Sequence, residues 1–209
     1  MNRRLKDPES HASSLANTML TETLYSRILG TARERGLVYG MSSGFSHTQA
    51  VSNWWFGAQV SDKNIRPLLK ITVDELHKLM DGHMTDEELE ATKQYALGRF
   101  QRGAQTVGGT AAGYAGRYFF DEVIDDYYHI PGRIKSVTKD SIVKVARAMF
   151  KDDVWGFGTL GNCGSRCLVA TARMRARPAS LNFFAEDNSL NIISTWPAIR
   201  SVSAGAVPL

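Results

Sequence analysis

The chain has 209 residues, of which 43% are hydrophobic and 22% charged, as in an ordinary globular domain with a core of its own. The net charge of +4 is concentrated at the end, because residues 1–165 carry 20 basic and 19 acidic side chains whereas residues 166–209 carry five Arg and two acids. This pattern lacks the interleaved aromatic residues of a nucleic-acid-binding protein, and no stretch reaches the roughly 18 apolar residues of a membrane span.

Residues 1–11 are polar and contain Pro8, so we expect a disordered leader. No apolar signal region follows MNRRLKDPES, and the cytoplasm is therefore the expected compartment. From residue 12 to residue 35, apolar side chains recur close to the helical period and predict one continuous helix.

Two runs of alternating polarity, residues 36–46 and 50–61, predict an antiparallel hairpin closed by a short loop. Trp54, Phe56, Ala58 and Val60 should line one face of this hairpin, and Trp55 and Gln59 the other. A helix capped by Asp62 should follow and end at residues 81–82. Thr85 and Glu88 then make a capping box for a long helix.

Glycines at positions 103, 108, 109, 113 and 116 indicate a helix break followed by close helix packing. A phosphate-binding loop is a weak alternative, because no strand precedes the glycines and no Gly-Lys-Ser/Thr follows them. The aromatic side chains expected in the core here are Tyr114, Tyr118, Phe119 and Phe120.

Pro131 and Gly132 predict a turn, and Thr138 should cap an amphipathic helix. A last strand is expected at residues 154–160. Beyond Gly161 no helical or strand periodicity is present. The expected organisation is thus a leader (1–11), one half domain (12–161) and a poorly ordered tail (162–209).

The residues with the clearest functional chemistry lie in the stretch 26–44, SRILGTARERGLVYGMSSG. Gly36 separates a helix from a strand, so Arg33 in the last helical turn and Tyr39 at the strand start should lie close together. Such a pair could hold a peptide carbonyl or a developing oxyanion. The local chemistry also fits an Arg that pairs with the helix C-terminal carbonyls and a half-buried Tyr in the sheet.

This stretch, followed by a strand pair and then by HMTDEELEATKQYALGRF, resembles the second-half domain of the pitrilysin and insulinase zinc metallopeptidases, which include the mitochondrial processing peptidases. The resemblance runs from about Leu15 to Gly161. Its most specific part is Arg-Glu at 33–34 with Gly-Leu-Val-Tyr at 36–39. By position, it implies that Arg33 and Tyr39 reach the substrate backbone at the zinc site, although the two are six residues apart here and more commonly seven in the family.

The resemblance implies an α+β fold, a small antiparallel sheet with helices packed on one face, of the LuxS/processing-peptidase-like half-domain type. Family domains begin with a strand before the first helix, and none is visible here, so we expect a domain truncated on its N-terminal side. The family's His-x-x-Glu-His zinc motif is absent, since no two of the five histidines are four residues apart. No metal ligands and no catalytic residues are therefore expected in this chain, which should bind no cofactor.

Two functions stay open. In the first, the chain is the non-catalytic, substrate-binding half of a zinc metallopeptidase, and a complementary domain or subunit supplies the zinc and acts on the peptide substrate. In the second, it is a degenerate relative that only assembles with other subunits. The presence of Arg33 and Tyr39 favours the first function, and their altered spacing favours the second.

Overall fold

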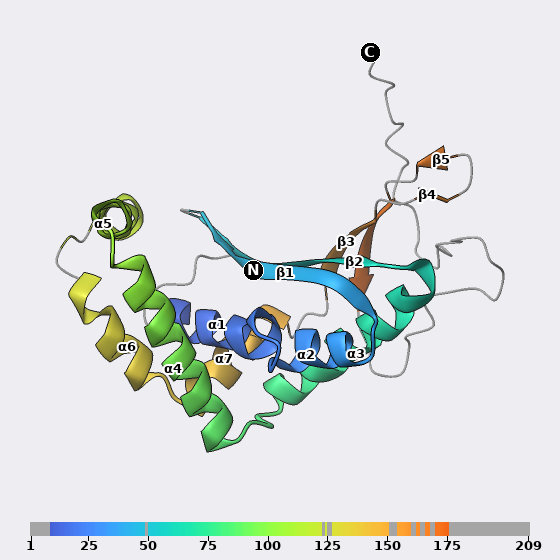
Figure 1. Cartoon of the computed structure of the whole chain (residues 1–209), viewed down its shortest axis with the longest axis horizontal. Coiled ribbons are helices and arrows are strands. Elements are labelled where there is room, and N and C mark those ends of the chain that lie inside the picture. Colours follow the sequence, from blue (N-terminus) through green and yellow to red (C-terminus); the bar gives the residue numbers. More distant parts are fainter. Residues whose placement is uncertain are drawn as a thin grey trace, which may run out of the picture. The chain divides into compact units, whose positions relative to one another are not determined.

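The computed structural model describes residues 9–48, 50–122, 124, 127–150, 154–159, 162–163, 166–167 and 170–175. The expectation of a disordered leader without the family's first strand falls, for residues 1–8, outside this part of the chain. In chain order the elements are α1 (Glu9–Asn17), the π-helix η1 (Thr18–Glu22), α2 (Arg27–Glu34), β1 (Val38–His47), β2 (Ser52–Val60), α3 (Asp62–Met80), α4 (Asp86–Gly103), α5 (Val107–Asp121), the 3₁₀-helix η2 (Tyr127–His129), α6 (Ile130–Ser136), α7 (Lys139–Phe150), β3 (Val154–Thr159), β4 (Asn162–Cys163), β5 (Arg166–Cys167) and β6 (Ala170–Arg175) (Figure 1).

The prediction of one continuous helix over residues 12–35 is wrong. The chain forms α1, turns into the π-helix η1, leaves the helical conformation at Thr23 and starts again as α2. Gly30 on α2 permits this break, because a Cβ at that position would lie 2.6 Å from the carbonyl oxygen of Leu24 in the connecting loop. The start was also misjudged, since residues 9–11 belong to α1 and not to a leader.

The predicted hairpin is confirmed. β1 pairs antiparallel with β2, and burial alternates along β2, with Trp54, Phe56, Ala58 and Val60 more buried than their neighbours. Met41, Phe45 and Trp54 pack from this face against the helical core, and the ring of Trp54 meets Phe150 of α7 edge to face at 5.4 Å.

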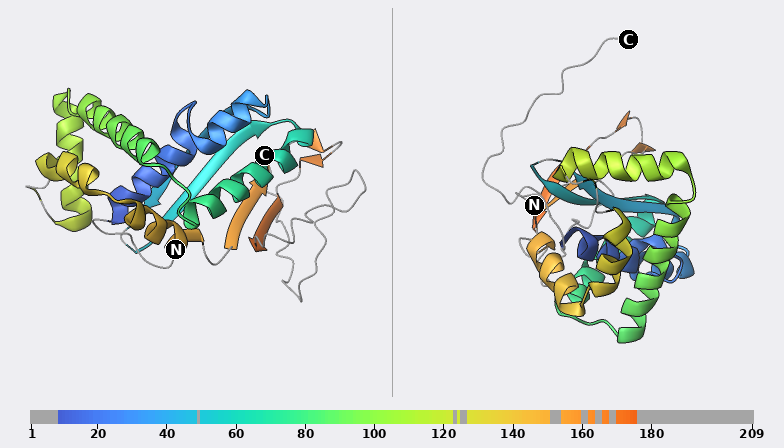
Figure 2. Two further views of the ribbon diagram at one scale, coloured as in Figure 1. Left: turned by 90° about the horizontal axis from the view of Figure 1, so that it is seen from below. Right: turned by 90° about the vertical axis from the view of Figure 1, so that its left-hand side faces the viewer.

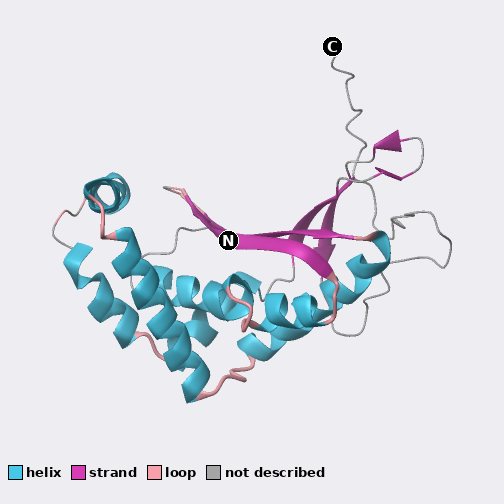
Figure 3. Cartoon of the chain, viewed as in Figure 1, coloured by secondary structure: helices cyan, strands magenta, loops and turns pink. Residues whose placement is uncertain are grey.

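Helices cover one face of the hairpin, as the sequence predicted. α1, η1 and α2 contact β1, and α7 packs against both α1 and α3 (Figure 2). Figure 3 shows this division between the magenta β1–β2 pair and the cyan helices beneath it. The core between them is aliphatic, and its most deeply buried large side chains are Leu15, Leu20, Ile28, Leu76, Leu79 and Ile142. The fold is α+β.

The capping predictions are correct at α4 and α7 but not at α3, where Asp62 is the first helical residue and no side chain caps the helix. Ser61 rather than Asp62 is the N-cap of α3, Thr85 caps α4 by accepting a hydrogen bond from the Glu88 amide, and the hydroxyl of Thr138 accepts from the Ser141 amide before α7. At the end of α3, Gly82 has a φ of +80°, the left-handed conformation that favours glycine.

Two predictions in the second half are wrong. Tyr118 and Phe119 on α5 are exposed and do not fill the core. Pro131 does not mark a turn, because it lies in the first turn of α6, where its missing N–H would have no helical partner anyway. The glycines do mark a break between α4 and α5, as expected.

The last predicted strand is present as β3, but it pairs with β6 and not with the hairpin. β4, β5 and β6 lie in the segment for which the sequence predicted no regular structure, so that expectation fails for residues 162–163, 166–167 and 170–175. The sequence of β6, ATARMR, does alternate small or apolar residues with polar ones, a short strand signal that the sequence analysis missed.

Candidate functional site

The turn between α2 and β1 determines where Arg33 and Tyr39 lie. Gly36 has a φ of +61°, its amide donates to the Arg33 carbonyl, and the Leu37 amide donates to the Ala32 carbonyl. This hydrogen-bond pattern is a Schellman motif, which requires a left-handed residue after the helix. A residue of α3 also stabilises the turn, because the side-chain Nδ2 atom of Asn64 donates to the Leu37 carbonyl oxygen at 3.0 Å.

Tyr39 lies at a β-bulge. In the register of the hairpin, Val38 faces Val60 and Gly40 faces Gln59, so Tyr39 is an additional residue without a partner on β2. The bulge explains why Val38 and Met41 both pack inward although they are three positions apart. It also directs Tyr39 outward, and its side chain is 84% exposed.

The structure brings Arg33 and Tyr39 together, as expected, and adds a direct contact that the sequence did not predict. The Nη1 atom of Arg33 donates to the backbone carbonyl oxygen of Tyr39 at 2.7 Å. The guanidinium therefore braces the bulge, and the phenol hydroxyl is left to the solvent side. A half-buried Tyr in the sheet, the alternative reading, does not describe this residue.

A second arginine in the same motif has a structural role that sequence reasoning missed. Arg27 is largely buried, and its Nε and Nη2 atoms donate to the two carboxylate oxygens of Glu88 at 2.6 and 2.5 Å. Nη2 also donates to the His83 carbonyl oxygen at 2.5 Å. This bidentate pair fixes the start of α2 against the start of α4. Glu88 could have pointed to this ion pair. The sequence analysis assigned it only to the capping box, whereas its carboxylate also binds Arg27.

No metal site can be built from the residues that the structure describes. Within them, no group of three or more His, Cys, Asp or Glu side chains is placed to hold an ion.

A cavity of about 350 Å³ lies away from the Arg33–Tyr39 pair. Its lining comes from α1, α4, α5, η2 and α6 and includes Leu15, Arg99, Phe100, Tyr127 and Ile134. The candidate site is the exposed surface of the α2–β1 turn. Among the described helices, none is long and apolar enough to cross a membrane.

Comparison with known proteins found one matching family profile and several similar solved structures. Residues 2–95 match the sequence profile of the family described as Peptidase M16 inactive domain. No protein of curated function matches the sequence. Similar solved structures include a protease from Helicobacter pylori (21% identity, TM-score 0.63), covering 72% of this chain and 37% of that one.

Two other similar structures have different contexts. One is the inactive peptidase domain of a protein described as a zinc protease from Bordetella parapertussis (18% identity, TM-score 0.59), covering 70% of this chain and 81% of that one. The other is a chain of complex III2 from Candida albicans (10% identity, TM-score 0.58), covering 70% of this chain and 37% of that one. At these identities the likeness establishes the fold. The chain spans little more than a third of the Helicobacter protein.

Proposed function

Since residues 2–95 match the profile of the peptidase M16 inactive domain family, we propose that the chain is the substrate-binding half of a zinc metallopeptidase. It contributes neither metal nor nucleophile. A complementary domain or subunit holds the zinc and the catalytic residues, and an extended peptide lies between the two halves. The cytoplasm, expected from the sequence, is the compartment that we propose, and cell fractionation would test it.

The observation that carries the proposal is the bulge at Tyr39. It directs a phenol hydroxyl away from the sheet beside an arginine whose guanidinium has further donors besides the N–H bonded to the Tyr39 carbonyl. A hydroxyl and a guanidinium can both donate hydrogen bonds to a peptide carbonyl oxygen, and these bonds become stronger when that oxygen becomes negative during hydrolysis. Bulges of this kind often lie beside active sites, where they redirect a side chain.

Reconstitution with a zinc-bearing half tests the proposal. The purified chain alone should contain no stoichiometric zinc by elemental analysis and should cleave no fluorogenic peptide, whereas the mixture with a zinc-bearing half of the same family should cleave it. One tightly bound zinc per chain, or cleavage by the chain alone, would contradict the proposal. So would a stable complex of the two halves that cleaves no unstructured peptide.

Arg33 can be examined in the same assay. Arg33→Lys keeps the positive charge but loses the planar arrangement of donors, so the KM for peptide should rise several-fold with little change in kcat. Arg35→Lys, at another exposed arginine two positions along the same turn, serves as the control. If both variants bind peptide like the wild type, Arg33 only braces the bulge.

The alternative is a role in assembly alone, and α5 is the feature that favours it. None of the described side chains of this helix is buried, and Val107, Tyr118 and Phe119 are exposed. A short helix with so little burial gains stability when another polypeptide covers it. In that case the two halves would associate, and substitutions at Arg33 or Tyr39 would leave any peptide cleavage unchanged.

A further inference from the structure

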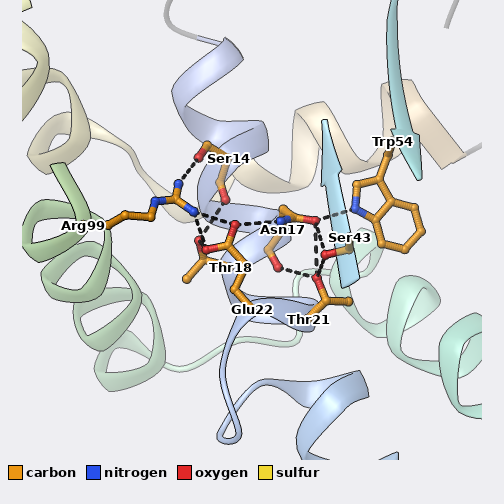
Figure 4. A network of polar contacts seen from close by, with 8 residues as sticks. All are labelled: Ser14, Asn17, Thr18, Thr21, Glu22, Ser43, Trp54 and Arg99. Carbon is orange, nitrogen blue, oxygen red and sulfur yellow. Dashed lines mark hydrogen bonds and ion pairs between the residues drawn. The ribbon is translucent and has the colours of Figure 1, made fainter. Parts of the chain in front are cut away.

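A polar network joins the π-helix η1 to both strands of the hairpin (Figure 4). At its centre lies Asn17, which is 3% exposed. Its Oδ1 atom accepts from the indole Nε1 of Trp54 at 2.7 Å and from the hydroxyl of Ser43 at 3.0 Å. Its Nδ2 atom donates to Glu22 at 2.9 Å. Ser43 lies on β1 and Trp54 on β2, so a single side chain holds the two strands.

The π-helical turn is what allows this arrangement. Asn17 and Glu22 are five residues apart, which on an ordinary α-helix would separate their side chains by about 140° around the axis. The i→i+5 pattern of η1 instead brings them to the same side. Thr21, on the same turn, donates to the Asn17 carbonyl oxygen at 3.0 Å and contacts the Ser43 hydroxyl.

The neighbours leave the Asn17 amide one orientation. The Trp54 indole can only donate and an ionised carboxylate can only accept, so Oδ1 must face Trp54 and Nδ2 must face Glu22. Glu22 is itself fixed, because Thr18 donates to it at 2.9 Å and Arg99 of α4 binds both of its oxygens at 2.5 and 2.6 Å. Arg99 also donates to Ser14 of α1 at 3.1 Å.

This chain of contacts leads from α4 through η1 to the strand that carries the candidate site. Ser43 is four residues beyond Tyr39 on β1, and the bulge leaves Tyr39 itself without a partner on β2. The position of the Tyr39 end of β1 therefore depends on contacts made elsewhere along the strand. Arg33 supplies one of them, and the Asn17 network supplies another.

We infer that Asn17 is a positioning residue for the β1–β2 hairpin. The role in placing Tyr39 against a substrate rests on the proposed function, whereas the positioning of the hairpin can be measured on the chain alone. A residue that only adds to overall stability would affect the whole domain equally. A positioning residue affects the hairpin first.

Hydrogen exchange of the full chain, measured by NMR, separates these two cases. In Asn17→Ala, the amides of residues 41–45 and 54–58 should exchange at least tenfold faster, beyond any change at the buried amides of α3 and α7. Asn53→Ala, an exposed position on β2, is the matched control and should leave both sets unchanged. Equal acceleration in the hairpin and in the helices, or none in the hairpin, would overturn the inference.

Ser43→Ala is a second, milder variant that tests the inference even if Asn17→Ala does not fold. It removes one hydroxyl and leaves the Trp54–Asn17 bond in place, so hairpin exchange should still rise, by roughly threefold. An unchanged hairpin in Ser43→Ala would contradict the inference even if Asn17→Ala cannot be purified.

A double-mutant cycle in the reconstituted peptidase connects this positioning with the site. If Asn17 acts through the strand that carries Tyr39, Asn17→Ala should lower kcat about tenfold with Tyr39 present and less than threefold in a Tyr39→Phe background. The same factor in both backgrounds would show that Asn17 does not act through Tyr39. If no cleavage occurs at all, the proposed function fails, and the exchange measurement still decides the positioning of the hairpin.

Discussion

Gly36 is the residue on which the geometry of the α2–β1 turn depends most directly. Its φ of +61° is strained for any L-residue with a side chain, although a Cβ would meet no atom within 4 Å. Gly36→Ala should therefore lower the free energy of unfolding by about 1 kcal/mol through the backbone alone. Urea denaturation followed by circular dichroism measures this.

Gly40→Ala provides the control for that prediction. A Cβ at Gly40 would also lie in open space, but Gly40 has no positive φ. Its substitution should change stability by less than about 0.5 kcal/mol. Equal losses in the two variants would mean that the left-handed turn is not what makes Gly36 necessary.

The proximity of Arg33 and Tyr39 could be predicted from sequence, because a glycine after a helical run fixes where the helix ends and the strand begins. The contact between them could not. It depends on the bulge, and the bulge depends on packing of the hairpin against the helical core. One signal was available: Val38 and Met41 are both apolar and three positions apart, which breaks the alternation of a regular strand.

At the scale of elements, the glycines of α5 have opposite roles. A Cβ on Gly113 would lie 2.2 Å from the ring of Tyr127, whereas a Cβ on Gly116 would meet nothing within 4 Å. Gly113→Ala should thus separate α5 from η2 and destabilise the domain, while Gly116→Ala should raise stability by about 0.5–1 kcal/mol through helix propensity.

Limited proteolysis, combined with thermal melting, would distinguish these two α5 variants. Cleavage within α5 should become faster in Gly113→Ala and slower in Gly116→Ala than in the wild type. Similar cleavage rates in both variants would count against the packing of Gly113 on Tyr127.

The start of α4 should make the stability of the fold depend on pH. Hydrogen bonds from its own backbone amide and from the Thr85 hydroxyl lower the pKa of Glu87 below its ordinary value of 4.5. The ionised carboxylate therefore stabilises the folded state above that value, and this contribution is lost as the pH falls through the lowered pKa.

Thr85→Ala should cost about 1 kcal/mol at neutral pH through the lost cap, and the difference from wild type should become smaller in acid, as the pH falls through the lowered pKa of Glu87. Thr85→Ser keeps the hydroxyl and is the control. Denaturant melts at neutral and at acidic pH measure the difference. A gap that stays constant or widens in acid would refute the assignment.

The element that sequence reasoning described least well is the N-terminal helical region. Its apolar spacing continues across the break, since Leu24 fits the helical period although it is exposed in the structure. The π-turn and the break are selected by long-range partners, namely Ser43, Trp54 and Arg99, which local periodicity does not include. The helix starts and the hairpin, by contrast, depend on residues that are close in the sequence, and their positions were predicted to within one or two residues.

At the scale of the whole molecule, the chain is one part of a larger functional unit in our account. It spans 37% of the length of the Helicobacter protease that it resembles, and its described residues hold no cluster that could bind zinc. Its contribution would be two donors on an exposed turn, and their effect depends on the surface that faces them.

The turnover of the reconstituted peptidase with Phe at position 39 tests this account most directly. Tyr39→Phe keeps the ring and removes one donor, so kcat should fall by roughly tenfold to a thousandfold, the range for losing one oxyanion donor, with KM and stability little changed. Tyr25→Phe, at a tyrosine that is 99% exposed on the loop before α2, should leave kcat unchanged. If the Tyr39→Phe enzyme instead cleaves peptide as fast as the wild type and the Tyr25→Phe control, Tyr39 does not act on the substrate and the chain is not the substrate-binding half that we propose.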